Sequence, residues 1–116
     1  MPEPSQDLSA EDSKLVTLAR AARARVSAVE GAAVRDGDGR TYAAASVGLP
    51  SLSLTALQLA VASAVAAGAG KLEAAAVVTE ASTLDGSGFA AVRDLAADAP
   101  VILAAPDGTV LDVIGD

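Results

Sequence analysis

The chain has 116 residues, which leaves room for a single domain, and it contains neither histidine nor cysteine. It therefore lacks the usual ligands of a hydrolytic zinc site, the base of a nucleophilic triad and any thiol or disulfide. The formal net charge of −7 argues against nucleic acid or an anionic membrane as a partner, because both are bound through a concentrated basic face.

The apolar side chains, 52% of the chain, are mostly small. Alanine makes up about a quarter of the sequence, and one Phe and one Tyr are the only aromatic residues. Such a chain can bury enough surface to fold, but each side chain contributes little area, so association of copies is a way to bury more. We expect a dimer or a higher homo-oligomer; the sequence does not identify any other protein partner.

The composition also bears on location. Without cysteine, and with a polar, acidic stretch over residues 1–10, the chain is expected to be cytoplasmic and to carry no secretion signal. The most apolar run, 54–70, is rich in Ala and Gly and contains Gln58 and Ser63, which indicates a buried helix rather than a membrane span.

In chain order, residues 1–8 hold two prolines and show no periodicity, so a disordered tail is predicted there and a single domain over 9–116. Ser9 followed by Asp12 is a variant of the capping box. The apolar residues that follow recur at helical spacing, which predicts a helix over 10–26.

A basic cluster lies on this helix at Arg20, Arg23 and Arg25. We interpret it as the solvated side of the helix, and a stripe facing a partner is the less favoured alternative.

From Gly31 the period changes to that of strands. The apolar run 32–34, the turn residues 36–39 and the run 41–45 predict a β-hairpin. Residues 47–53 contain glycine, proline and serines and are expected to form a loop.

Ser51 or Ser53 is the expected N-cap of a second helix, which begins near Leu54 and ends at Gly68. The remaining expected elements are a buried strand over 72–79, a third helix that follows 85–88 and ends before Pro100, and strands over 101–105 and 110–114 on either side of a turn at 106–108. The order α-β-β-α-β-α-β-β predicts a three-layer α/β/α domain with a mixed sheet of about five strands.

Two stretches carry a resemblance to a known family. Gly31-Ala32-Ala33-Val34 and Asp38-Gly39-Arg40-Thr41-Tyr42 resemble, at the same spacing, the Gly-Ala-Ala-Leu strand and the Asp-Gly-Arg turn of the cytidine deaminase family. Weaker similarities lie at residues 60–68, 92–95 and 100–108, and the resemblance extends over about 14–114. It implies a cytidine deaminase-like fold and a homo-oligomer that is a dimer or a tetramer.

The resemblance also implies where chemistry would lie. Enzymes of the family hold Zn²⁺ with a Cys-Ala-Glu or His-Ala-Glu and a Pro-Cys-x-x-Cys, and their Glu shuttles protons. The first zinc-ligand position falls on Thr55, the proton-shuttle position on Leu57, and the paired ligand positions on Asp85 and Gly88. The match therefore implies a degenerate member with no catalytic residue, no metal and no cofactor.

The family's ribose contacts, an Asn-x-Glu, align with Ser46-Val47-Gly48. Ser46 and Gly48 are thus the vestigial candidates for substrate binding, and neither is the Asn or the Glu of that motif.

Three other patterns fit structural roles better than sites. Gly68-Ala69-Gly70-Lys71 lacks the other residues of a phosphate-binding loop and predicts a helix stop. Asp36-Gly37-Asp38-Gly39 lacks the closing Glu of a calcium loop and predicts a hairpin turn. The carboxylates of Glu80, Asp85, Asp94 and Asp98 could hold a hard cation, but solvated surface charge is the favoured interpretation.

The leading hypothesis is a non-catalytic, cytidine deaminase-like pseudoenzyme that acts as an oligomeric structural or partner-binding subunit. An alternative is a ligand-binding module for a nucleoside or another small molecule. A second alternative is a cytidine deaminase or related hydrolase with residual activity.

Overall fold

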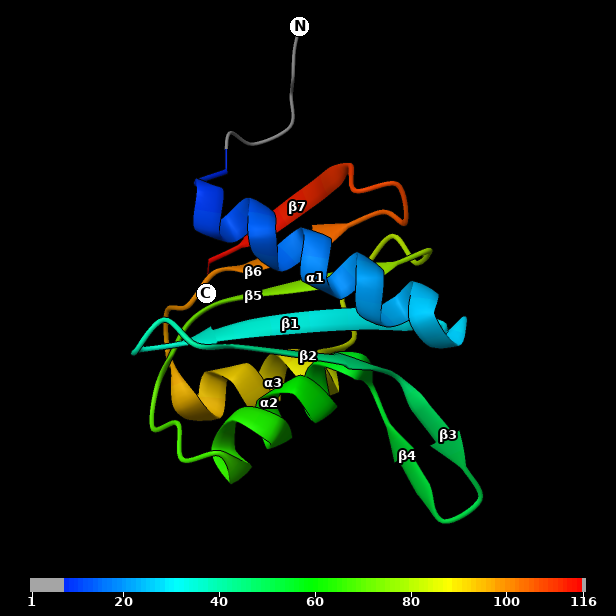
Figure 1. Cartoon of the computed structure of the whole chain (residues 1–116), viewed down its shortest axis with the longest axis horizontal. Coiled ribbons are helices and arrows are strands. Elements are labelled where there is room, and N and C mark those ends of the chain that lie inside the picture. The colour runs from blue at the N-terminus through cyan, green and yellow to red at the C-terminus, as the bar shows by residue number, and fades with distance from the viewer. Residues whose placement is uncertain (1–7, 116) are drawn as a thin grey trace, which may run out of the picture.

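The computed structural model describes residues 8–115. The tail expected over 1–8 lies outside this range except for Leu8, which is partly buried against the core. The helices are α1 (Ala10–Val26), α2 (Ala56–Ala66) and α3 (Gly86–Leu95), and the strands are β1 (Glu30–Asp36), β2 (Thr41–Ala45), β3 (Val47–Leu49), β4 (Leu52–Leu54), β5 (Leu72–Thr79), β6 (Val101–Ala104) and β7 (Val110–Ile114) (Figure 1).

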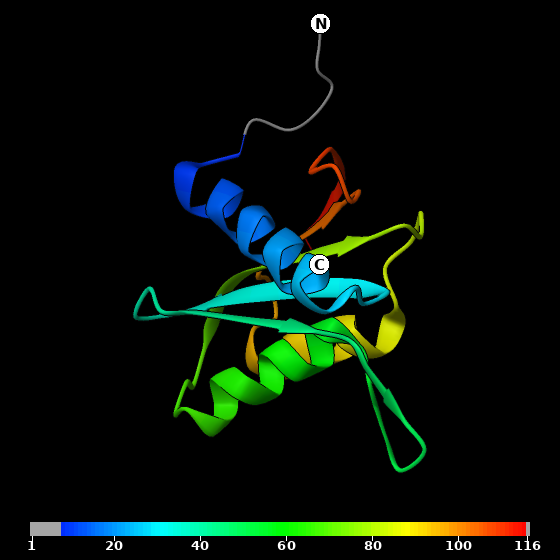
Figure 2. The same ribbon diagram turned by 45° about the vertical axis from the view of Figure 1, so that its right-hand side comes forward.

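Five strands form one mixed sheet in the order β2-β1-β5-β6-β7. The pairs β1–β2, β1–β5 and β6–β7 are antiparallel, whereas β5 and β6 are parallel and are connected through α3. Helix α1 covers one face of the sheet, and α2 and α3 cover the other (Figures 1 and 2). The predicted three-layer fold with a five-stranded mixed sheet is confirmed.

The core divides into two apolar clusters, one on each face of the sheet. Alternate residues of β5 point to opposite sides: Ala74, Ala76 and Val78 join the cluster under α1, whereas Ala75 and Val77 join the cluster under α2 and α3. This alternation explains why the segment is almost uniformly apolar, since both of its faces are covered. The predicted central strand is confirmed.

Helix α1 begins and ends as predicted, and it packs unusually close to β1. The Ser9 hydroxyl accepts a hydrogen bond from the backbone N–H of Asp12 at 3.1 Å, which caps the helix. A Cβ atom on Gly31 would lie 2.0 Å from the Ala19 carbonyl oxygen and 2.8 Å from the Arg23 Cβ. Only glycine allows this approach.

The basic cluster on α1 is only partly a solvated face. Arg25 is exposed as expected, but Arg20 donates from Nε to the Pro106 carbonyl at 3.0 Å. The half-buried Arg23 donates to the Val29 carbonyl at 3.2 Å and pairs with the Glu80 carboxylate at 3.3 Å. These arginines tie the helix to neighbouring loops, which the helical period could not reveal.

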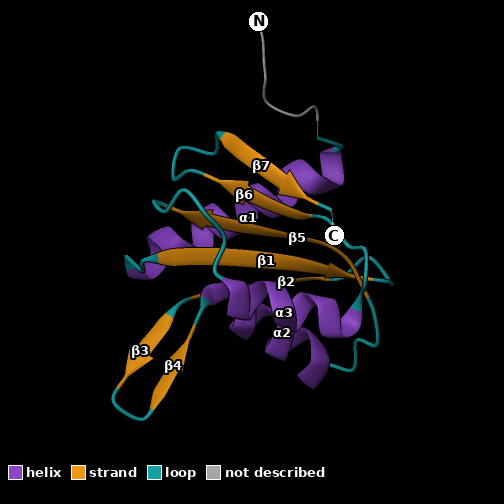
Figure 3. Cartoon of the chain, turned by 180° about the vertical axis from the view of Figure 1, so that it is seen from behind, coloured by secondary structure: helices purple, strands orange, loops and turns teal. Residues whose placement is uncertain are grey.

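The loop expected over 47–53 is a hairpin, so the element order gains the two short strands β3 and β4. The reason is that apolar residues alternate on both sides of Pro50 and Ser51, which occupy the turn. The hairpin projects away from the main sheet (Figure 3).

The expected cap of α2 at Ser51 or Ser53 is also wrong, because the hairpin includes or encloses both serines. Thr55 is the N-cap: its hydroxyl accepts from the Gln58 N–H at 3.0 Å, and the Gln58 side-chain oxygen accepts from the Thr55 N–H at 2.9 Å. This reciprocal pair is a capping box. The helix ends near Gly68, which has the left-handed φ of 101° expected of a glycine stop.

A buried carboxylate holds the turn between β1 and β2. The buried Asp36 carboxylate accepts from the backbone N–H groups of Asp38 and Arg40, both at 2.9 Å, and from the Tyr42 hydroxyl at 2.8 Å. This is the predicted hairpin turn.

Among the helices of residues 8–115, none is both long and apolar enough to cross a membrane.

Candidate functional site

The sequence-predicted site residues gather where α2 and α3 begin, beside the start of β1. A shallow cleft of about 340 Å³ opens there. Its lining residues are Val29, Glu30, Ser46, Val47, Gly48, Ser53, Leu54, Thr55 and Asp85. Four positions singled out from the sequence, Ser46, Gly48, Thr55 and Asp85, therefore face one cleft, and Leu57 and Gly88 lie beside Thr55 in the core below.

Thr55, at the position that the resemblance assigns to the first zinc ligand, is half buried and is the N-cap of α2. Its hydroxyl oxygen already accepts the Gln58 N–H. The same oxygen lies 3.3 Å from the point that a Cβ on Gly88 would occupy. The two positions are 33 residues apart in sequence by their numbering and adjacent in space.

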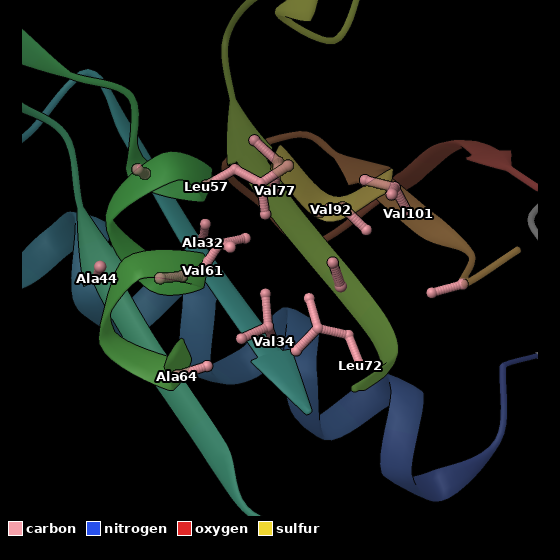
Figure 4. Close-up of a cluster of buried hydrophobic side chains, with 14 of the residues drawn as sticks. Ala32, Val34, Ala44, Leu57, Val61, Ala64, Leu72, Val77, Val92 and Val101 are labelled. Atoms are coloured by element: carbon pink, nitrogen blue, oxygen red, sulfur yellow. The ribbon is translucent and has the colours of Figure 1, made fainter. Parts of the chain in front are cut away.

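Leu57, at the proton-shuttle position, is 2% exposed. Its side chain extends from α2 into the apolar cluster that includes Val77 of β5 and Val92 of α3 (Figure 4). The position that the resemblance assigns to a titratable group is thus occupied by an aliphatic side chain, which cannot accept or donate a proton.

Gly88, at the last paired-ligand position, is buried against Leu57. A Cβ atom added here would lie 3.0 Å from the Leu57 Cβ and 3.2 Å from its Cδ2. Both distances are tighter than ordinary van der Waals contact. A side chain of any kind at position 88 therefore competes with Leu57 for the same space.

Asp85, at the other paired-ligand position, is the N-cap of α3. One carboxylate oxygen accepts the Ser87 N–H at 2.8 Å and also the Ser87 hydroxyl. These hydrogen bonds from Ser87 hold the pKa of Asp85 below its ordinary range. The carboxylate is exposed and charged, and its bonds satisfy the helix end.

Ser46 and Glu30 connect the edge of the cleft to the sheet. The Ser46 hydroxyl accepts the Glu30 N–H at 3.2 Å, and the Ser46 N–H donates to the Glu30 carbonyl at 3.1 Å. The Ser46 hydroxyl therefore binds the backbone, and Gly48, exposed on β3, has no side chain that could contact a ligand.

Glu30 is the cleft residue that sequence reasoning missed. Burial raises its pKa above the ordinary value, a hydrogen bond with Thr79 opposes that rise, and the nearby negative charge of Asp85 adds to it. The available signal was a carboxylate immediately before the apolar strand that begins at Gly31. Glu30 and Asp85 make the cleft acidic.

The residues at the four motif positions do not fit Zn²⁺. Leu57 and Gly88 offer no donor atom, Thr55 offers only a hydroxyl, and Asp85 is a single carboxylate, whereas a catalytic zinc needs three ligands. Among residues 8–115, no three His, Cys, Asp or Glu side chains come together as a metal-binding group. Glu80, Asp85, Asp94 and Asp98, weighed above as a hard-cation site, are each exposed.

Comparison with known proteins identifies the family of this fold. The family model described as cytidine deaminase-like matches residues 8–108. A cytidine deaminase from Burkholderia pseudomallei has 30% sequence identity and a TM-score of 0.76, with 88% of this chain and 90% of that one covered. One from Mycobacterium leprae, at 23% identity and a TM-score of 0.66, covers 94% of both chains and bears on the fold alone.

Among curated proteins, none matches the chain. The family model spans nearly the whole of the described domain, including α1, the sheet up to β6 and the helices that carry the four motif positions. The chain belongs to the cytidine deaminase-like family.

Proposed function

We propose that this protein is a non-catalytic member of its family that acts as an oligomeric structural or partner-binding subunit in the cytoplasm. The observation that carries the proposal is Leu57, which is packed into the core at the position of the proton shuttle. Hydrolytic deamination requires a group that transfers protons at the reacting atoms and an activated water. The four motif positions supply neither.

The two carboxylates of the cleft do not replace the lost groups. Asp85 is engaged with Ser87 at the helix end, and Glu30 interacts with Thr79 at the start of the sheet. A general base also needs a water that is activated and positioned, and the donor set around Thr55 and Gly88 cannot hold the metal that does so in the family.

The oligomeric role is supported by the small core. Most of the buried residues are Ala or Val, so each contributes little apolar area. Contact between copies adds buried area that such a core cannot supply from one chain.

A turnover assay tests the non-catalytic role. The purified protein, supplied with zinc, is expected to form no uridine from cytidine above the level of the Leu57→Ala variant, in which the core packing is changed but no catalytic group is added. Uridine formation that requires Glu30 or Asp85, lost in E30Q or D85N, would contradict the proposal and support the residual-activity alternative.

The cleft itself favours the second candidate, a ligand-binding module. A volume of about 340 Å³ lies within the range of small-molecule sites, and Glu30 and Asp85 could accept hydrogen bonds from a nucleoside or another small molecule. A ligand at 100 times its Kd should add about 2.7 kcal/mol to the free energy of unfolding. A thermal-shift screen of nucleosides and bases that shows no change in Tm would contradict this candidate.

A further inference from the structure

The main sheet ends at β7 with an edge to which no further strand is paired. Among residues 8–115, β7 pairs with β6 and with no other strand. Figure 3 shows β7 as the outermost strand of the sheet. The outer side of such a strand presents backbone N–H and C=O groups that a neighbouring strand has not taken, so a further strand can be added there.

A cavity lies beside β7 on each face of the sheet. On the face of α1, a cavity of about 400 Å³ lies between that helix and the β6–β7 turn and reaches Val110. On the opposite face, a cavity of about 340 Å³ lies between β7 and the start of α3 and reaches Asp112 and Ile114. Successive side chains of a strand point to opposite faces, so an added strand would place alternate side chains beside the two cavities.

The cavity on the α3 face has apolar walls and one charge. Leu84, Phe89, Leu103 and Ile114 supply the walls, and among the described residues Asp112 is the only charged one that lines it. A side chain with an aliphatic stem and a cationic end matches this cavity, because the stem packs on the walls while the end meets the carboxylate. Lys and Arg are the side chains of this kind.

The cavity on the α1 face suits a small neutral side chain. Its two charged lining residues, Arg20 and Asp107, have opposite signs, and Ser13 and Thr17 add hydroxyl groups. Arg20 is already engaged with the Pro106 carbonyl. This cavity therefore selects for neither charge.

Asp112 also protects the edge in the free chain. The Val113 N–H donates to the Asp112 carboxylate at 2.8 Å. A side-chain acceptor thus satisfies this backbone donor locally, and charged side chains are a common protection of exposed edges. A segment that offers a backbone carbonyl to Val113 and a cation to Asp112 replaces this hydrogen bond and leaves neither group unpaired.

We propose that β7 binds an extended, basic segment of another protein as an additional strand, in which Lys or Arg alternates with small neutral residues. The proposal rests on the partner-binding role proposed above and names its surface and the chemistry of its partner. Charge selects the partner: the chain carries a net charge of −7, and Asp107 and Asp112 are both exposed at this edge. A second copy is disfavoured here, because a symmetric contact between two β7 strands would bring these carboxylates together.

The first test uses blocked hexapeptides in which Lys alternates with Val, added to the full chain. Fluorescence anisotropy should show saturable binding, the amide resonances of β7 should shift, and a peptide with Glu in place of Lys should not bind. D112N keeps an acceptor for the Val113 N–H but removes the charge, so it should raise the Kd by about fivefold. D98N, an equally exposed position outside the cavity, is the control and should leave the Kd unchanged.

Backbone N-methylation separates strand addition from simple attraction between charges. Methyl groups on the Lys residues and methyl groups on the Val residues block opposite edges of an extended peptide. One of the two methylated peptides should lose affinity by about a hundredfold or more, and the other should bind as the parent does. Equal binding of the two would overturn the proposal, as would a Lys peptide that does not bind or whose Kd is the same for D112N.

Sedimentation without peptide tests the other occupant, a second copy. Leu111→Asp adds a charge at a residue of β7 that is 48% exposed, and it should leave the assembly mass unchanged. A change in mass would show that a copy of the chain covers this edge and would overturn the proposal. Peptide binding by a protein that proves active in the turnover assay would overturn the non-catalytic role alone, so the two failures are distinguishable.

Discussion

At the N-terminal ends of α2 and α3, Leu57 and Gly88 meet at the positions that the motif resemblance assigns to a proton shuttle and a zinc ligand. Leu57 fills the space that a side chain at position 88 would need. Thr55 and Asp85, the other two assigned positions, are helix caps. Each of the four residues thus has a packing or capping role.

This contact predicts that the cost of Gly88→Ala depends on the residue at position 57. In the wild type it should destabilise by about 1 kcal/mol, because crowding against Leu57 outweighs the helix propensity of alanine. In Leu57→Ala, which alone should cost about 2–5 kcal/mol, the same change should destabilise less, because the contact with Cδ2 at 3.2 Å is gone while the contact with Cβ at 3.0 Å remains. Urea unfolding of the four proteins measures the coupling.

Gly86→Ala is the matched control, because a Cβ there would meet nothing within 4 Å. It should show no coupling to Leu57→Ala. Equal effects of Gly88→Ala in both backgrounds would contradict the contact.

At the scale of elements, the packing of α1 on β1 leaves the least room for an added side-chain atom. Gly31→Ala should lower the free energy of unfolding by about 3 kcal/mol or more, since its Cβ would overlap the Ala19 carbonyl oxygen and the helix would have to move away. Gly70→Ala, in open space, is the control. A Tm for Gly31→Ala within about 3 °C of the control would show that the contact is looser than described.

The β1–β2 turn predicts an acid-dependent loss of stability. Burial raises the pKa of Asp36, but the Tyr42 hydroxyl and the N–H groups of Arg40 and Asp38 outweigh burial and hold that pKa below its ordinary value. A lowered carboxyl pKa contributes stability above the ordinary value of about 3.9, and the contribution is lost as pH falls through the folded-state pKa.

Tyr42→Phe removes one of these hydrogen bonds and should bring the pKa of Asp36 closer to its ordinary value. The variant should therefore be less stable than the wild type at neutral pH, and the difference should shrink below about pH 4. Urea unfolding at both pH values measures the two differences. A difference that stays constant with pH would show that Asp36 is not the group involved.

Elements that are marked by their own caps and periodicity could be predicted from the sequence. Elements whose position depends on which of several similar residues is used could not. The helix over 10–26 follows from its cap and its period. The β3–β4 hairpin could not be predicted, because Pro50 and the serines around it are typical of loops and its strands are only three residues long. Ser51, Ser53 and Thr55 alternate with two leucines, so which of the three caps α2 depended on where that hairpin ended.

The site shows the same division. The positions of Thr55, Leu57, Asp85 and Gly88 came from a resemblance in motif spacing, and the structure places them together. Glu30 could not be found in this way, because only the tertiary fold brings the start of β1 beside Asp85.

At the scale of the whole molecule, two apolar clusters, one on each face of the sheet, hold the layers of the family's fold together. Leu57, at the position that the resemblance assigns to the proton shuttle, belongs to one of these clusters. The acidic cleft opens beside it at the surface.

If packing has replaced the metal centre of the family, as we propose, the protein binds no structural or catalytic zinc. The most direct measurement is the zinc content of the protein purified from zinc-supplemented cells without a metal-affinity step. We expect far less than one zinc per chain, and a Tm that does not change when a chelator is added. One tightly bound zinc per chain, whose removal lowers the Tm, would contradict it.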